Sequence, residues 1–505
     1  ASKGASKARP ISQQQLDELS KIASELRSKE LTSPERAEAV KRAFVHAWNG
    51  YEAAAFGHDE IKPVSNTSAD SWQGFGATLI DSLDTMILMG LDDELRRARE
   101  FVAKLDFYQD VPASFFEFTI RYVGGLLGAH SLSGDELYLK KATEIADRLM
   151  HSFGSASPFP RSTVNLKTTK ANYPGWNSGN AILSEIGSCQ LEFAYLSHHT
   201  QNQSYNNAAR NVYSVLHKMT KSTPGLYPVS VSPDASGFGS QHVTLGGLAD
   251  SFYEYLIKLW ILTNGEDDES LEMYTESANS IEEHLVRRVE DLSKRDEEFV
   301  FLGELDGKRH TNQMEHLQCF AGGMFALGSF HSRELKPQTN AEQLLVKKRN
   351  QHLDLGAQLA ESCASLYWYS SSGLAPESIQ YTEKSDLVQN GWWTAQTKYM
   401  LRPETVESLF VLYRATGEQK YRDWGWEIFL SIEEQCRTPF AYSGLRDATK
   451  RKSLDNWDDS MQSFFLAETL KYLYLLFAED ANGMPLLPID EYVFTTEAHP
   501  LKILR

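Results

Sequence analysis

The sequence predicts an all-α fold in which about seven helical hairpins pack into one domain. The first observation is a recurring pattern: an apolar helical stretch ends in Ser, Thr or Asn, usually with Gly, and a polar turn leads to a tyrosine that opens the next helix. The tyrosines are Tyr138, Tyr205, Tyr274 and Tyr421, spaced by 67, 69 and 147 residues, and the last spacing is close to two periods. The second observation is that strand signals are nearly absent before the C-terminal tail.

Each repeat is interpreted as a helical hairpin that is too apolar to stand alone. Gly134, Gly265 and Gly417 follow the first helix of their repeats, where glycine takes the positive φ of a helix end without strain. Such hairpins must bury their apolar faces against their neighbours. Periodicity leaves open whether they form a linear solenoid or a closed ring.

The chain of 505 residues exceeds the usual size of a single core, which favours two or three domains or one large ring. The joints rich in proline and glycine at 173–176 and 374–376 resemble loops between hairpins and not linkers between domains. We therefore expect an N-terminal arm over residues 1–35 and a single domain over residues 36–505. Residues 1–10 are small, basic and polar, as in a stem segment.

Composition excludes several classes of function. A hydrophobic content of 41% supports a packed core, and a formal charge of −18 argues against nucleic-acid binding, which needs a basic face. No apolar run reaches the ~18 to 20 residues of a membrane span. The triplets that begin at Asn66 and Asn202 are acceptors for N-glycosylation and weakly favour a secreted glycoprotein.

The cysteine count permits a disulfide without fixing it. The four cysteines allow three complete pairings, and no C-x-x-C motif of the kind that binds zinc is present. These cysteines are Cys189, Cys319, Cys363 and Cys436.

Acidic residues recur at the starts of the first helices of the hairpins. They are Glu117, Glu185, Asp250 and Glu404. Any one of them is explained by the helix dipole, which favours an acid at a helix N-terminus. Four acids at equivalent positions of one repeat would instead converge at one end of the helical assembly. Glycoside hydrolysis needs such a group, because one carboxyl protonates the leaving oxygen while another activates water.

Seven stretches, in order from about residue 36 to the C-terminus, resemble the class I α1,2-mannosidases of glycoside hydrolase family 47. They are TLIDSLDTM (78–86), FEFTIRYVGGL (116–126), DSFYEYL (250–256), HLQCF (316–320), LRPETVES (401–408), SFFLAETLKY (463–472) and TEAHP (496–500). The resemblance implies an (α/α)7 barrel with a small C-terminal β-hairpin that plugs one end. It also implies an inverting exo-mannosidase that depends on Ca²⁺.

The resemblance assigns roles to individual residues. Glu117 corresponds to the general acid, Glu404 to the general base, and Asp250 to a third essential carboxylate that is an alternative acid. Thr496 matches the Ca²⁺ ligand, through its carbonyl and hydroxyl oxygens. The remaining matches are water-orienting acids (Glu185, Glu407, Glu497), substrate contacts (Arg121, His316, Arg402) and the disulfide pair Cys319–Cys363.

Two positions sort the chain within the family. Leu248 stands where the endoplasmic-reticulum branch has an arginine that restricts it to one mannose, and Gln462 stands where that branch has a glutamate. Both substitutions resemble the Golgi group of the family. With leucine at position 248, the pocket should admit several branches of the glycan. Gln462 removes a charge near the metal.

The resemblance also implies a substrate and a setting. We expect trimming of high-mannose N-glycans towards a five-mannose core by a Golgi or secreted enzyme of the secretory pathway. We expect a monomer, no nucleic-acid partner, and membrane attachment only through an N-terminal anchor outside this sequence. The alternative is a glycan-binding relative in folding quality control with weak or no hydrolase activity, which the full set of carboxylates disfavours.

Overall fold

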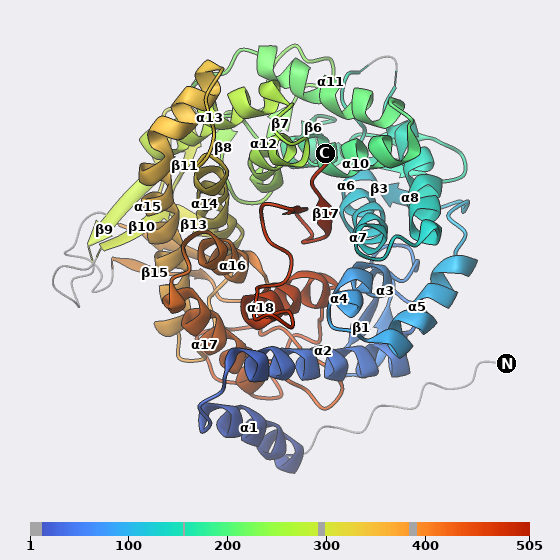
Figure 1. Cartoon of the computed structure of the whole chain (residues 1–505), viewed down its shortest axis with the longest axis vertical. Coiled ribbons are helices and arrows are strands. Elements are labelled where there is room, and N and C mark those ends of the chain that lie inside the picture. The colour runs from blue at the N-terminus through green and yellow to red at the C-terminus, as the bar shows by residue number, and fades with distance from the viewer. Residues whose placement is uncertain (1–12, 155–156, 291–297, 383–390) are drawn as a thin grey trace.

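The chain forms two concentric rings of helices in a computed structural model that describes residues 13–154, 157–290, 298–382 and 391–505 (Figure 1). The inner ring consists of α3 (Ala77–Asp81) with α4 (Leu83–Leu88), α7 (Gly124–Ser133), α10 (Gln190–Thr200), α12 (Asp250–Leu262), α14 (Ala321–His331), α16 (Glu404–Thr416) and α18 (Leu470–Phe477). The outer ring consists of α2 (Ser33–Ala55), α5 (Asp92–Lys104), α8 (Glu136–Leu149), α11 (Ser204–Lys218), α13 (Asp268–His284), α15 (Asn340–Trp368) and α17 (Gln419–Gln435).

The inner and outer helices differ in how much of their surface is buried. In α12 every residue from Ser251 to Leu262 is buried, as expected for a helix covered on all sides. Outer helices such as α8 bury one face, which includes Tyr138, Ala142 and Ile145. The core therefore lies between the rings and around the inner helices.

The assembly closes into a ring and is not a linear solenoid. The first outer helix, α2, packs against the last inner helix, α18. Next to them, α3 and α4 contact η5 (Phe465–Thr469), which leads directly into α18. Every inner helix thus contacts the next around the circle, which confirms the (α/α)7 barrel.

The predicted repeat marks the turns from inner to outer helices. Gly134 and Gly417 end α7 and α16 with φ of 68° and 73°. Tyr138, Tyr205 and Tyr421 lie in the first turn of α8, α11 and α17, and all are buried. Tyr274 is also buried but lies in the second turn of α13.

The expectation that strands are nearly absent before the tail is wrong. Small antiparallel sheets of two or three strands join the outer helices to the next inner helices. Their strands are β1 (Glu60–Lys62), β2 (Thr67–Ala69), β3 (Pro112–Ser114), β4 (Thr163–Asn165), β5 (Ala171–Asn172), β6 (Ala181–Ile182), β7 (Ser230–Val231), β8 (His242–Val243), β9 (Val286–Glu290), β10 (Glu298–Leu302), β11 (Glu304–Asp306), β12 (Arg309–Thr311), β13 (Gln313–Glu315), β14 (Ser378–Tyr381) and β15 (Trp392–Gln396). Most are too short to show the alternation by which strands are predicted.

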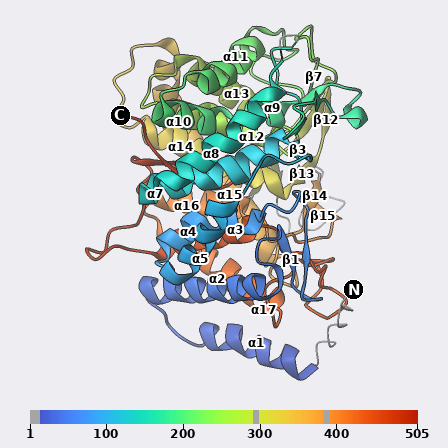
Figure 2. The same ribbon diagram turned by 90° about the vertical axis from the view of Figure 1, so that its right-hand side faces the viewer.

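The two ends of the barrel therefore differ. Connections from outer to inner helices are long and carry β1 to β15, whereas connections from inner to outer helices are short turns. The inner helices consequently begin at the strand-bearing end, which Figure 2 shows edge-on at the right. Acids at the starts of inner helices are brought to this end by the topology.

The C-terminal hairpin enters from the opposite end. Strands β16 (Tyr492–Phe494) and β17 (Pro500–Lys502) pair antiparallel, with Val493 opposite Leu501. The Lys502 N–H donates to Ser131 Oγ near the end of α7 (3.1 Å), while the loop 495–499 lies inside the ring. The predicted plug is thus present, and Figure 1 shows β17 and the segment before it inside the ring of helices.

The N-terminal helix α1 (Gln13–Arg27) lies outside the ring against α17. Arg27 Nη1 donates to Glu427 Oε2 at 2.5 Å. The predicted boundary after residue 35 falls in the first turn of α2, and the division into arm and domain stays a prediction. Within the described ranges, no helix combines the length and apolar character needed to span a membrane.

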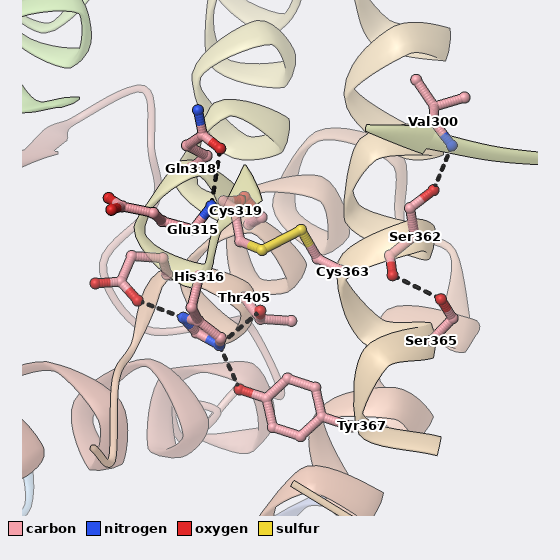
Figure 3. Close-up of a disulfide and its surroundings, with 12 residues drawn as sticks. Val300, Glu315, His316, Gln318, Cys319, Ser362, Cys363, Ser365, Tyr367 and Thr405 are labelled. Carbon is pink, nitrogen blue, oxygen red and sulfur yellow. Dashed lines mark hydrogen bonds and ion pairs between the residues drawn. A yellow bond between two sulfur atoms is a disulfide. The ribbon is translucent and has the colours of Figure 1, made fainter. Parts of the chain in front are cut away.

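A disulfide joins Cys319 and Cys363, as the family resemblance implied (Figure 3). It ties η4 (His316–Phe320) to α15 and closes a loop of 44 residues. Chain-entropy estimates give such a loop about 4 kcal/mol of stabilisation. Cys189 and Cys436 are buried and unpaired in disulfides.

Candidate active site

Glu404 is the first residue of α16, and Pro403 is the N-cap of that helix. His316 Nδ1 lies 2.8 Å from Glu404 Oε2, and the other ring nitrogen lies 2.8 Å from Tyr367 Oη. Figure 3 shows how Tyr367 and Thr405 hold the His316 ring. Burial acts to raise the pKa of Glu404, but the hydrogen bond from His316 and the nearby positive charges outweigh it and lower the pKa. Glu404 is therefore kept as a carboxylate.

Asp250, the first residue of α12, is shifted in the opposite direction. Burial raises its pKa to about 7, and the charges of Glu254, Glu404 and Glu315 add to the effect. The Ser251 N–H donates to Asp250 Oδ1 at 2.9 Å and acts the other way. Asp250 thus holds a proton more readily than an ordinary carboxyl, at a site where it senses Glu404.

Glu117 lies where the inner helix is irregular. The helix that begins near Glu117 is not uniform but consists of α6 (Phe115–Glu117), a π-helical stretch η1 (Phe118–Val123) and α7. Such stretches are frequent at functional sites because they redirect side chains. Ser114 Oγ caps α6 by accepting from the Glu117 N–H, and Arg121 Nε donates to Glu117 Oε2 at 2.8 Å. The Glu117 side chain remains 21% exposed, so solvent reaches it.

Arg121 joins Glu117 to the C-terminal loop. Its Nη1 donates to Glu497, to Ser463 Oγ (2.9 Å) and to Asp81 Oδ2 (3.5 Å). Burial disfavours the charged guanidinium, but the charges of Glu497, Glu117 and Asp81 raise the pKa of Arg121 well above its usual value. In the structure Arg121 is a buried cation paired with Asp81, Glu117 and Glu497, and its contact with the substrate stays a prediction.

A second buried network clamps the same loop. Both ring nitrogens of His499 face carboxylates, with Nδ1 2.7 Å from Asp84 Oδ2 and Nε2 3.1 Å from Asp81 Oδ1. Lys471 Nζ donates to the Ala498 carbonyl and lies 2.8 Å from Asp84 Oδ1. The side chains of all four charged residues are fully buried. The position of the loop 495–499 is thus set by fixed charges.

This loop presents Thr496 to the interior. The Thr496 N–H donates to Tyr255 Oη (3.1 Å), and this hydroxyl in turn donates to Glu192 Oε1 (2.8 Å). Within the described part of the chain, the Thr496 hydroxyl and carbonyl oxygens have no hydrogen-bond partner. Two oxygen atoms that could coordinate a cation are therefore free at the tip of the plug.

Several acids around this tip have raised pKa values, because burial and neighbouring carboxylates disfavour their charged forms. Burial raises the pKa of Glu407 to about 8 although Lys258 Nζ lies 3.3 Å away, and it raises that of Glu185 to about 7, with Glu117 adding to the shift. Burial and neighbouring carboxylates also raise the pKa of Glu468 and Glu497 well above the usual value. A cation bound by oxygen would relieve this repulsion. Among the described residues, no cluster of three His, Cys, Asp or Glu side chains is arranged to hold a metal directly.

Glu185 lies in α9 (Leu183–Gly187), which is separated from α10 at Ser188 and Cys189. The single helix expected from Glu185 onwards is therefore wrong, and the break lets Glu185 approach Glu117.

The remaining predicted residues take separate places. Arg402 donates to both oxygens of Glu377 (2.6–2.9 Å), so its guanidinium is already engaged. Leu248 has φ of 77° and is 41% exposed, two residues before Asp250. Gln462 Nε2 lies 3.3 Å from Ser460 Oγ. Asn66 and Asn202 are exposed in turns, and their glycosylation stays a prediction.

Sequence reasoning missed several residues of the site. Asp81, Asp84, Glu468, Lys471 and His499 all lie inside the stretches that carry the family resemblance, but only the folded chain gives them a function as partners. Glu315 accepts from the Gly247 N–H at 2.8 Å and acts on Asp250, and the one available signal was its position beside His316. No sequence feature pointed to Glu377 as the partner of Arg402.

Comparisons with known proteins agree with this geometry. The model of glycosyl hydrolase family 47 matches residues 43–503. Mannosyl-oligosaccharide 1,2-alpha-mannosidase IB of Mus musculus is 39% identical over 472 residues, which cover 92% of this chain and 69% of the relative. The endoplasmic reticulum mannosyl-oligosaccharide 1,2-alpha-mannosidase of Homo sapiens is 41% identical, over 93% of this chain and 64% of the relative.

A solved structure is similar over almost its whole length. The alpha-1,2-mannosidase from Trichoderma reesei superposes with a TM-score of 0.83 at 32% identity, over 93% of this chain and 99% of that chain. Family model, relatives and structure point the same way. The chain belongs to glycosyl hydrolase family 47.

Proposed function

We propose that this protein is an inverting exo-α1,2-mannosidase that acts on high-mannose N-glycans. The observation that supports this most directly is the pair Asp250 and Glu404, whose pKa values are shifted in opposite directions while the two side chains interact. A pair of carboxyls with separated pKa values is the arrangement that general acid and general base require. The names of the relatives supply the substrate class.

In the proposed reaction Glu404 removes a proton from water as the water attacks the anomeric carbon. His316, held by Tyr367, keeps Glu404 ionised and oriented. Asp250, whose pKa of about 7 is raised in part by the charge of Glu404, can supply the proton to the leaving oxygen. Glu117, the acid that the family resemblance implies, is placed opposite Arg121 and can deliver a proton through water.

Thr496 would hold Ca²⁺ through its hydroxyl and carbonyl oxygens, with Glu185, Glu407 and Glu497 as acceptors for the waters of the ion. The free Thr496 oxygens and the cluster of buried acids around them support this assignment. When bound, the ion supplies a fixed positive charge against the hydroxyls of the terminal sugar. The chain's own contribution is the clamp at His499 and Lys471, which fixes where Thr496 stands.

Several finer assignments belong to the same proposal. The enzyme trims the glycan towards a five-mannose core in the manner of the Golgi branch. It is a monomeric glycoprotein that acts in the Golgi or outside the cell. An arm over residues 1–35 precedes its one catalytic domain. Overall sequence identity does not select a branch, because this chain is 39% identical to one of the two relatives and 41% identical to the other. The assignment to the Golgi branch rests on Leu248 and Gln462. The alternative is a glycan-binding protein without hydrolase activity. Binding alone does not require that the pKa values of Asp250 and Glu404 be separated, so this separation favours the enzyme.

The first prediction concerns the general base. Glu404→Gln should lower kcat by ~10²–10⁴-fold while glycan binding is retained, because the amide keeps the shape but cannot accept the proton of water. Mannose release and glycan affinity would be measured side by side. Glu418→Gln, an exposed residue at the far end of the barrel, is the control. A Glu404→Gln enzyme with more than about a tenth of the wild-type rate contradicts the assignment.

The second prediction concerns the metal. Exhaustive chelation, verified by elemental analysis, should abolish mannose release, and Ca²⁺ should restore it. Thermal unfolding should also shift to lower temperature without the ion, because a ligand that binds only the folded state stabilises it. Full activity in protein shown to be free of metal would refute the Ca²⁺ assignment.

The third prediction concerns branch choice. Leu248→Arg should slow some of the successive cleavages of the nine-mannose glycan more than others, because arginine can form bidentate hydrogen bonds that leucine cannot. The expected difference between branches is ~10–200-fold. Both side chains must adopt the same positive φ, so backbone strain is matched. Met484→Arg, exposed at the opposite end, controls for added charge. Wild-type digestion that ends after one mannose contradicts the Golgi-like assignment.

A further inference from the structure

A cleft of about 200 Å³ opens at the strand-bearing end, away from the carboxylates. It lies between the connection from α11 to β7, the loop from β7 to β8, and the turn from β11 to β12. Its lining includes Thr220, Thr223, Phe238, Ser240, Gln241 and Val243. A cleft of this size holds roughly seven waters, from a liquid volume of ~30 Å³ each. It can therefore accept one sugar ring in their place.

The lining is neutral although the protein is strongly charged. Charged residues make up 23% of the chain, yet none of the described residues around this cleft carries a charge. It instead combines hydroxyls, one amide and the half-buried ring of Phe238. Sites for small neutral ligands combine apolar walls with a few placed polar groups in this way. A sugar matches this lining, since it presents hydroxyls at its rim and C–H groups on its faces.

One polar group in the lining lacks a partner. Ser240 Oγ is buried and, within the described residues, forms no hydrogen bond. Buried polar groups are nearly always paired, so an unpaired one indicates a bound water or ligand. Because this oxygen is almost inaccessible to solvent, it belongs to the wall of the cleft and is not an open contact.

The cleft is within reach of the catalytic residues. Val243 lines it, and Leu248 follows five positions later, which allows at most about 18 Å of extended chain between them. Asp250 follows Leu248 by two residues. A branched oligosaccharide with its cleaved end at Asp250 would have to span a distance of this order to place another branch in the cleft.

We propose that this cleft is a second carbohydrate subsite, which binds a mannose unit of a branch other than the one being cleaved. This inference rests on the proposed mannosidase function and adds to it. Binding there would orient the whole glycan, so that branch choice depends on the cleft as well as on Leu248. The contacts assigned to it are stacking on Phe238 and a hydrogen bond to Gln241.

The test compares a large and a small substrate. Phe238→Ala and, separately, Gln241→Ala should raise KM for the nine-mannose glycan about tenfold with kcat unchanged. Both variants should cleave an α1,2-linked mannose disaccharide, which cannot span the two sites, at the wild-type rate. Trp368→Ala removes an exposed aromatic from the outer face of α15 and is the control.

Each outcome decides a separate point. An unchanged KM for the glycan in both variants, or equal losses on glycan and disaccharide, overturns the subsite. If wild-type protein releases mannose from neither substrate, the proposed function itself fails. A matching loss of glycan affinity when Phe238→Ala is added to the Glu404→Gln protein would confirm binding at the cleft independently of turnover.

Discussion

The ion pairs of Arg121 are the interaction on which the rest of the site depends. One buried guanidinium bridges Glu117 on an inner helix and Glu497 on the C-terminal loop, with Asp81 beside them. Removing one partner of such a buried group typically costs about 3–5 kcal/mol, because the other charges are left uncompensated. The ring of helices and its plug are therefore held in register by charge as well as by apolar packing.

The same constraint explains the proposed chemistry. Inner helices begin at one end of the barrel, so their first residues bring negative charge to one place. Positive side chains neutralise part of it, at Arg121, Lys258 and His499. The two catalytic carboxyls are affected differently: His316 lowers the pKa of Glu404, while burial and neighbouring acids raise the pKa of Asp250 to about 7. A general base, a proton donor and a place for a cation follow from one distribution of charge.

Much of this could be predicted from local sequence, because its signals are local. The glycine and tyrosine pattern marked the hairpins, and acids at helix starts predicted convergence at one end. Closure of the ring could not be predicted from the repeat, since it depends on α2 and α18, which lie more than 400 residues apart. The short strands, the π-helical stretches and the pairs Arg402–Glu377 and Glu315–Gly247 were also missed. Each depends on pairing between segments that the sequence does not show to be neighbours.

The stereochemistry of the first product tests the central claim most directly. If Glu404 activates water while Asp250 or Glu117 protonates the leaving oxygen, a single displacement inverts the anomeric carbon. Proton NMR during the first minutes of glycan hydrolysis should then show β-mannose before mutarotation produces the α-anomer. Initial release of α-mannose would indicate a covalent intermediate and retention, and would contradict the division of roles between these carboxyls.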